Sequence, residues 1–87
     1  MYIITQSNIN IDTLIPEGTV SILGKYDSFK EAEMSVIKFV TKGIEEGFEG
    51  NIERTTEEAW TITSEGYKRR TYIEIVNLDF VKNWDEK

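Results

Sequence analysis

Hydrophobic and polar residues alternate with a period of two in three parts of the chain, at residues 19–26, 59–64 and 68–76. Alternation of this kind predicts strands that bury one face of a sheet. A β-prone run at residues 2–5 predicts a further strand. Residues 6–18 contain Asn, Pro and Gly and are expected to form a long loop, either wholly irregular or with one irregular extended stretch. The pattern therefore predicts four strands.

The alternation also assigns residues to faces. Trp60 and Ile62 lie on one face of their predicted strand, and Ile73 and Ile75 on one face of theirs, so we expect them in the core. One face of the 19–26 strand is predicted to carry Val20, Ile22, Gly24 and Tyr26. In the loop, Pro16-Glu17-Gly18 fits a β-turn. Aliphatic residues are expected to hold this loop against the domain, namely Ile9, Ile11, Leu14 and Ile15.

A helix is predicted over residues 29–42, with a looser turn to 46. Ser28 and Glu31 match the capping box, in which the serine oxygen accepts a hydrogen bond from a backbone N–H three residues later. Gly43 is expected to end the helix in the left-handed conformation. A stripe at helical spacing predicts the buried face, and its members are Phe29, Ala32, Val36, Phe39, Val40 and Gly43.

These elements predict an α+β domain in which one amphipathic helix packs on an antiparallel sheet of three or four strands, in the order β-β-α-β-β. The 87 residues are expected to form a single domain. Besides the loop at 6–18, we expect an acidic loop or arm at 43–58, in which residues 51–56 form a short extended arm, and a tail at 81–87, in which Trp84 folds back.

The composition narrows the possible functions. The chain has no Cys and no His, which excludes disulfides, thiol nucleophiles, imidazole chemistry and Cys/His metal sites. It also lacks the P-loop, G-x-G-x-x-G and G-x-S-x-G motifs. We therefore expect no enzyme activity, no catalytic residues, no cofactor and no metal site. Without a long apolar run or a signal-peptide pattern, the chain is expected to be cytoplasmic and free of membranes.

The net charge of −6 disfavours direct binding to nucleic acid. Glutamates concentrate between residues 42 and 58, and we predict that they contact a partner protein. A row of carboxylates can imitate phosphates and occupy the basic groove of a nucleic-acid-binding host protein. The alternative is a solvated face that contributes only solubility. The candidate residues are Glu45, Glu46, Glu49, Glu53, Glu57 and Glu58.

The one basic cluster gives an alternative site. Cations between aromatic residues on a sheet can hold single-stranded nucleic acid or a nucleotide by phosphate contact and stacking. The candidate residues are Tyr67, Lys68, Arg69, Arg70 and Tyr72. Two structural roles compete with this hypothesis. The cations can block the pairing of an edge strand, or they can pair across a hairpin with Glu57 or Glu65.

A third hypothesis concerns the sheet face opposite the helix, where Tyr72, Leu23 and Val76 are predicted to lie. If this face is uncovered, it is a candidate surface for a homodimer. In the alternative, the N-terminal loop or the tail with Trp84 covers it.

Short motifs follow one another in a recognisable order: Gly24-Lys25-Tyr26-Asp27-Ser28 before the helix, Gly47-Phe48 after it, a strand containing Ile73-Glu74-Ile75, then Leu78-Asp79 and Trp84. This order resembles a family of small uncharacterised bacterial and phage domains. The resemblance implies an accessory protein of a phage or bacterium, and it implies no activity.

The residues and the resemblance together predict a protein-binding module that inhibits a host nucleic-acid-handling or defence protein through its acidic surface. A nucleic-acid binder and a homodimeric structural protein are the alternatives.

Overall fold

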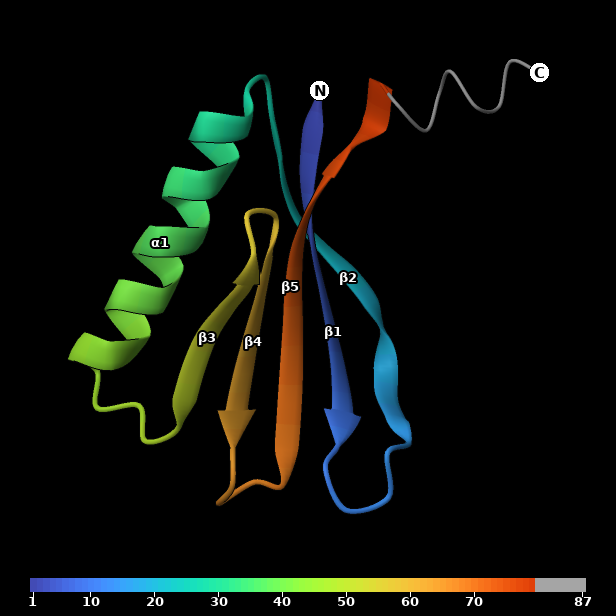
Figure 1. The fold of residues 1–87 in the computed structure, drawn as a ribbon, viewed down its shortest axis with the longest axis vertical. Coiled ribbons are helices and arrows are strands. Elements are labelled where there is room, and N and C mark those ends of the chain that lie inside the picture. Colours follow the sequence, from blue (N-terminus) through green and yellow to red (C-terminus); the bar gives the residue numbers. More distant parts are fainter. Residues whose placement is uncertain (80–87) are drawn as a thin grey trace.

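One helix lies across a five-stranded antiparallel sheet in the computed structural model, which describes residues 1–79 (Figure 1). The strand order in the sheet is β2-β1-β5-β4-β3. The elements are β1 (Tyr2–Asn10), β2 (Pro16–Tyr26), α1 (Phe29–Glu45), β3 (Asn51–Thr56), β4 (Ala59–Ser64) and β5 (Arg69–Asn77). The predicted α+β class and antiparallel sheet are confirmed. The tail at 81–87, with Trp84, lies outside the described residues.

The prediction of a long loop at 6–18 is wrong. Strand β1 continues to Asn10, and β2 begins at Pro16, which pairs with Ile9 instead of starting a β-turn. The side chain of Asn10 organises the short connection, because its Oδ1 accepts hydrogen bonds from the backbone N–H groups of Asp12 and Thr13 at 2.9 and 3.0 Å. Polar residues form strand here because β1 lies between β2 and β5 and is held by two ladders.

The acidic segment at 43–58 is not a single loop or arm. Residues 51–56 form β3, which pairs with β4 through Ile52↔Ile62 and Arg54↔Trp60. The sheet therefore has five strands, and the element order is β-β-α-β-β-β, not β-β-α-β-β. Only one side chain of β3 is apolar, so the segment has no alternating pattern that predicts a strand. It is a strand because its backbone pairs with β4.

Helix α1 starts as predicted but ends one turn later. The Ser28 Oγ accepts a hydrogen bond from the Glu31 backbone N–H at 3.2 Å, which confirms the N-cap. Gly43 is helical, and Gly47, with φ of 90°, is the left-handed residue. The Gly47 N–H donates to the Ile44 carbonyl and the Phe48 N–H to the Gly43 carbonyl. This is the Schellman pattern that we expected at Gly43.

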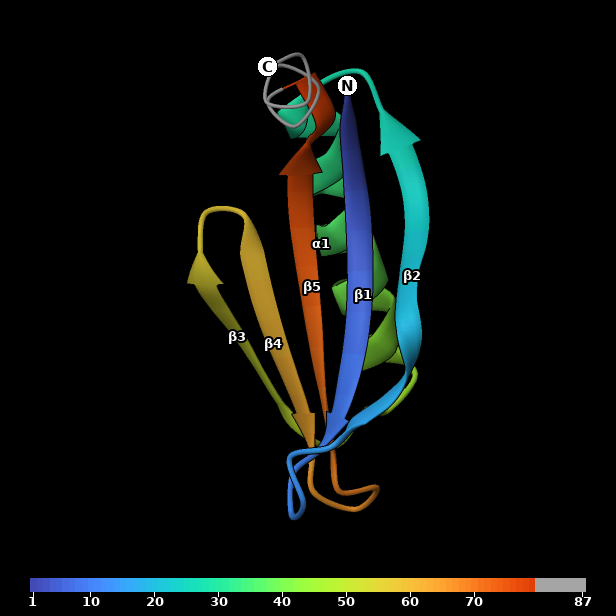
Figure 2. The same ribbon diagram turned by 90° about the vertical axis from the view of Figure 1, so that its right-hand side faces the viewer.

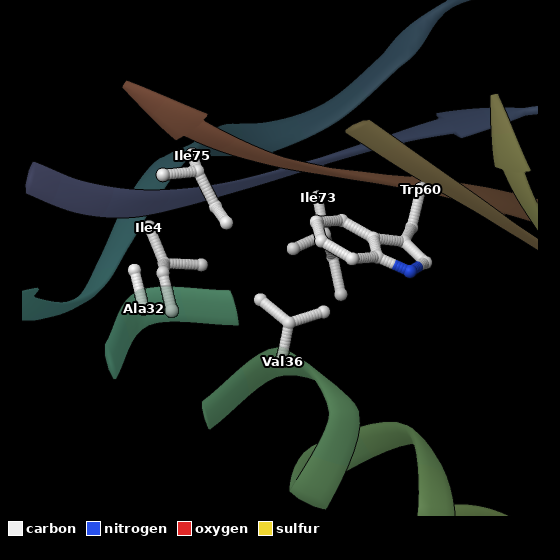
Figure 3. Packing of buried hydrophobic residues seen from close by; sticks show 6 residues of the cluster. All are labelled: Ile4, Ala32, Val36, Trp60, Ile73 and Ile75. Atoms are coloured by element: carbon white, nitrogen blue, oxygen red, sulfur yellow. The ribbon is translucent and has the colours of Figure 1, made fainter. Parts of the chain in front are cut away.

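The core lies between the N-terminal half of α1 and the middle of the sheet. Ala32 has no exposed surface, so the helix backbone approaches the sheet closely at this point. Figure 3 shows the sheet residues of the cluster directed toward the helix. The prediction that Phe39 is buried is wrong, because 52% of it is exposed. The buried cluster consists of Ile4, Ala32, Val36, Trp60, Ile73 and Ile75.

A β-bulge changes the faces of β2. Ile4 pairs with Gly24, but the next residue, Thr5, pairs with Ile22, so one residue of β2 is skipped. Residues directly opposite each other share a face, and Thr5 faces away from the helix because Ile4 faces toward it. Ile22 therefore lies on the face away from the helix, not beside Tyr26 as alternation predicted, and 61% of it is exposed.

Polar contacts fasten the same half of α1 to the sheet. The Tyr26 hydroxyl lies 2.7 Å from the Ser35 Oγ. The Arg54 guanidinium is 2.6 Å from a Glu33 carboxylate oxygen, and it lies over the Trp60 ring, 4.6 Å from the ring centre. These contacts involve residues 33–35 of the helix, so the N-terminal half of α1 is the attached half.

Removal of a buried side chain measures the strength of this attachment. Ile73→Ala is expected to lower the free energy of unfolding by about 2–5 kcal/mol, and the milder Ile73→Val by about 0.5–1.5 kcal/mol. Ile37→Ala, at an exposed helix position, is the control and is expected to change it by less than about 0.5 kcal/mol. Urea unfolding followed by far-UV circular dichroism measures all three; equal losses at 73 and 37 would contradict this core.

Candidate protein-interaction site

The structure places five of the six candidate glutamates at two ends of the sheet. Glu45, Glu46 and Glu49 lie at the end of α1 and in the following loop. Glu57 and Glu58 form the turn between β3 and β4, at the opposite end of β3 (Figure 1). A six-residue strand spans about 20 Å, so these glutamates do not form one continuous row. All six side chains are exposed.

Glu53 lies between the two groups, in the middle of β3. It pairs with Thr61, which neighbours the inward-facing Trp60. By alternation, Glu53 therefore faces away from the helix. It belongs to neither group, and the predicted contact of all six glutamates with one flat basic surface has no single face to support it.

The carboxylates at the end of α1 stand where the helix dipole is already negative. Glu45 is the last helical residue and Glu46 is the C-cap. Acidic side chains at this end are unfavourable by about 0.3–1 kcal/mol each. The one nearby cation in an ion pair, Lys42, is 4.0 Å from Glu46. The α1 terminus therefore concentrates negative potential at a cost in stability.

The stop signal of the helix also positions an aromatic side chain. The hydrogen bond from the Phe48 N–H to the Gly43 carbonyl turns the chain back toward α1. Gly50 is needed next to it, because an added Cβ would collide with the Phe48 ring and with the Thr63 carbonyl oxygen. The Phe48 side chain therefore lies beside the last turn of the helix.

A groove opens between the C-terminal half of α1 and the sheet. Its volume is about 440 Å³. Most of its lining is apolar, and Lys42 and Glu46 supply the charges. Phe39, which we expected in the core, stands at this groove instead. The lining residues are Gln6, Phe39, Val40, Lys42, Gly43, Glu46, Phe48, Ile52, Ile62 and Thr71.

The turn between β4 and β5 meets the same end of the molecule. A neighbouring depression is lined by Glu49 and Phe48 from one side and by Tyr67 from the other, and Tyr67 is 81% exposed. A further depression is lined by Glu49, Glu65 and Arg70. Sequence reasoning missed Phe39, Phe48 and Glu65 as site residues. The sequence did contain one signal for Phe48: a Gly-Phe pair at a helix end, followed by Gly50, indicates a tight turn that holds the phenylalanine beside the helix.

The basic cluster is divided by pairing and by geometry. Lys68 and Arg69 form ion pairs with Asp12 and Glu17, at 3.0 and 3.2 Å. Arg69 and Arg70 are consecutive in β5 and therefore lie on opposite faces of the sheet. The carboxylates that pair come from the β1–β2 hairpin, not from Glu57 or Glu65 as expected.

Protection of an edge does not explain these cations either, because β5 lies in the centre of the sheet. Lys68 and Arg69 instead link the β4–β5 turn to the β1–β2 hairpin, where the Ile11 N–H also donates to the Lys68 carbonyl.

Within residues 1–79, no group of three acidic side chains lies close enough to hold a metal ion, and every buried side chain is hydrophobic. No helix in this part of the chain is long and apolar enough to cross a membrane. No protein-family model, curated protein or solved structure matches the chain. Function is therefore inferred from the groove, its aromatic side chains and the charges around it.

The cost of the acidic helix end can be measured. Glu45→Gln is expected to raise the free energy of unfolding by about 0.3–1 kcal/mol, because it removes a charge from the negative end of the dipole. Glu31→Gln, with the same change of charge in the first turn, is the matched control and is expected to lower it. Thermal unfolding at low salt measures both, and salt should shrink the difference. A loss of stability in Glu45→Gln would contradict this assignment.

Proposed function

We propose that the chain is a non-catalytic protein-binding module whose groove, between α1 and the sheet, takes an apolar side chain from a basic segment of a partner. The observation that supports this proposal is the coincidence of an apolar groove with exposed carboxylates on one end of the molecule. Glu45, Glu49 and Glu65 form no ion pair with a described residue, so their charges remain available to a partner.

The two parts of this site have different roles. Burial of an apolar or aromatic side chain against Phe39 and Phe48 supplies affinity, because aromatic residues in desolvated pockets carry most of the binding energy of an interface. The carboxylates at the rim attract a basic segment and orient it, which raises the association rate and excludes acidic partners. A partner segment that combines Lys or Arg with apolar residues fits both parts.

Proteins that handle nucleic acid carry basic surfaces of this kind. We propose that the partner is a host nucleic-acid-handling or defence protein and that the module acts on it as an inhibitor in the cytoplasm. The charge of the groove rim supports a basic partner. The resemblance to small phage and bacterial domains supports a phage or mobile-element origin.

The electrostatic part of the proposal is tested with a fluorescent amphipathic peptide of Lys and Leu. Fluorescence anisotropy should show binding that weakens as salt rises. The double variant Glu46→Gln/Glu49→Gln should weaken it about tenfold. The double variant Glu57→Gln/Glu58→Gln has the same net charge but changes the other end of β3, and it should bind like the wild type. Equal weakening by both pairs would contradict this site.

The apolar part is tested separately. Phe39→Ser should weaken binding of the Lys/Leu peptide about tenfold and leave the fold intact, because this side chain is half exposed. A peptide in which Ser replaces Leu should bind weakly and should not distinguish Phe39→Ser from the wild type. If Phe39→Ser binds the Lys/Leu peptide as the wild type does, the groove is not the binding site.

The nucleic-acid alternative makes the opposite prediction. Because Lys68 and Arg69 are paired with carboxylates and the net charge is −6, we expect no binding of a short single-stranded oligonucleotide at physiological salt. The same anisotropy assay measures it. Binding that is lost in the Arg70→Gln variant would favour the nucleic-acid site over the protein site.

A further inference from the structure

We infer that the sheet face opposite α1 joins two copies of this chain in a symmetric dimer. The proposed groove lies on the helix side, and the two surfaces approach each other where Arg70 lines one depression with Glu49 and Glu65. Figure 2 shows the sheet from its open side, with α1 behind it. None of the described elements covers this face: of the N-terminal loop expected at 6–18, residues 6–10 are part of β1 and residues 16–18 are part of β2.

The register identifies the residues on this face. Val76 pairs with Ile3, Glu74 with Thr5, Tyr72 with Ser7 and Arg70 with Ile9. The bulge in β2 adds Ile22, opposite Thr5, and skips Leu23, the third residue of the predicted patch with Tyr72 and Val76. The apolar side chains that the register places on this face and that are half-buried or exposed are Ile9, Ile22, Tyr72 and Val76, beside the buried Ile3.

The charges on this face favour a second copy over the basic partner proposed for the groove. Lys25 and Glu53 lie toward opposite sides of the face, and Arg70 and Glu74 lie on the central strand β5. The strand residues of this face carry two cations and two anions, although the whole chain carries −6, and Glu49 and Glu65 border the face in a depression that Arg70 also lines. The strands of two copies therefore meet here without net repulsion.

Arg70 and Glu74 are also self-complementary. They flank Tyr72 at two residues on either side, about 7 Å along the strand. A two-fold axis that passes over Tyr72, perpendicular to β5, sets each Arg70 against Glu74 of the other copy. Stacked sheets cross at about 30°. This angle moves each Arg70 about 3.5 Å sideways from the facing Glu74, and a long arginine side chain spans that distance. Neither residue forms an ion pair with another described residue.

The area is sufficient for a dimer. Five strands about 4.8 Å apart make a face about 24 Å wide, and strands of six to nine residues are about 20–30 Å long. Each copy therefore offers on the order of 500–700 Å², and the two together about 1,000–1,400 Å². Stable interfaces begin at about 1,200 Å². The face is thus close to the smallest area that a stable dimer buries.

Charge reversal tests the pairing. Sedimentation equilibrium of the full chain should give a dimer in the micromolar range. Arg70→Glu places carboxylates against each other at two symmetric points and should raise the dissociation constant at least about tenfold. Glu74→Arg should do the same by opposing two cations. The double variant Arg70→Glu/Glu74→Arg restores opposite charges and should dimerise like the wild type.

Lys30→Glu, on exposed helix surface, changes the net charge as Arg70→Glu does and should leave the dimer unchanged. Far-UV circular dichroism checks folding, because Arg70 also donates a hydrogen bond to the Thr63 Oγ1 at 3.4 Å. A monomeric wild type, single variants that dimerise normally, or a folded double variant that stays monomeric would each overturn the inference. Peptide binding by the groove is decided by the Phe39 variant, because Phe39 does not line the depression that Arg70 shares with Glu49.

Discussion

The close approach of α1 to the sheet at Ala32 is the contact on which the rest of the structure depends. A side chain of one carbon lets the helix backbone reach Ile4 and Ile75, and one turn later Val36 reaches Ile73 and Trp60. The buried cluster is small for a domain of this size, so polar contacts from residues 33–35 of the helix supplement it. The polar contacts and the buried helix residues lie in the first half of α1, and the second half packs against the cluster only at its edge, through the half-buried Val40.

The candidate site follows from that asymmetry. Because α1 runs obliquely to the strands (Figure 1), the half beyond Val36 leaves space that Phe39, Phe48 and the Ile52–Ile62 pair border without filling it. The Schellman stop at Gly47 then adds the loop with Glu49 to the rim. A longer apolar stripe on α1 would have closed this space and stabilised the domain. The glutamates at the helix terminus likewise lower stability, and features that cost stability without serving the fold are typical of functional surfaces.

Local rules predicted the parts of the fold that depend on neighbouring residues. The Ser28 cap, β4 and the inward residues of β5 were predicted correctly, because capping and alternation act within a few positions. The extension of β1, the strand β3 and the position of Ile22 depend on pairing between distant segments, and a single skipped residue reverses the faces beyond it. Glu45, Glu46 and Glu49 of the candidate site could be selected from the sequence, whereas Glu65 could not, because it follows β4 and reaches the site only through the fold. The groove could not be predicted, because helical periodicity placed Phe39 in the core. Periodicity shows which face of a helix is apolar, but it does not show where the helix diverges from the sheet.

The two proposed surfaces are compatible with each other because they lie on opposite sides of the sheet. The groove is bordered by helix-side residues such as Ile62 and Thr71, whereas the dimer uses Tyr72 and Val76 on the other side. A dimer through the sheet face opposite α1 therefore leaves both grooves open and directed outward. Two weak sites on one particle bind a partner with repeated basic segments more tightly than either site alone, provided that both segments reach. A shallow groove of about 440 Å³ gives modest affinity by itself, so pairing two copies is a physical route from a weak contact to stable capture.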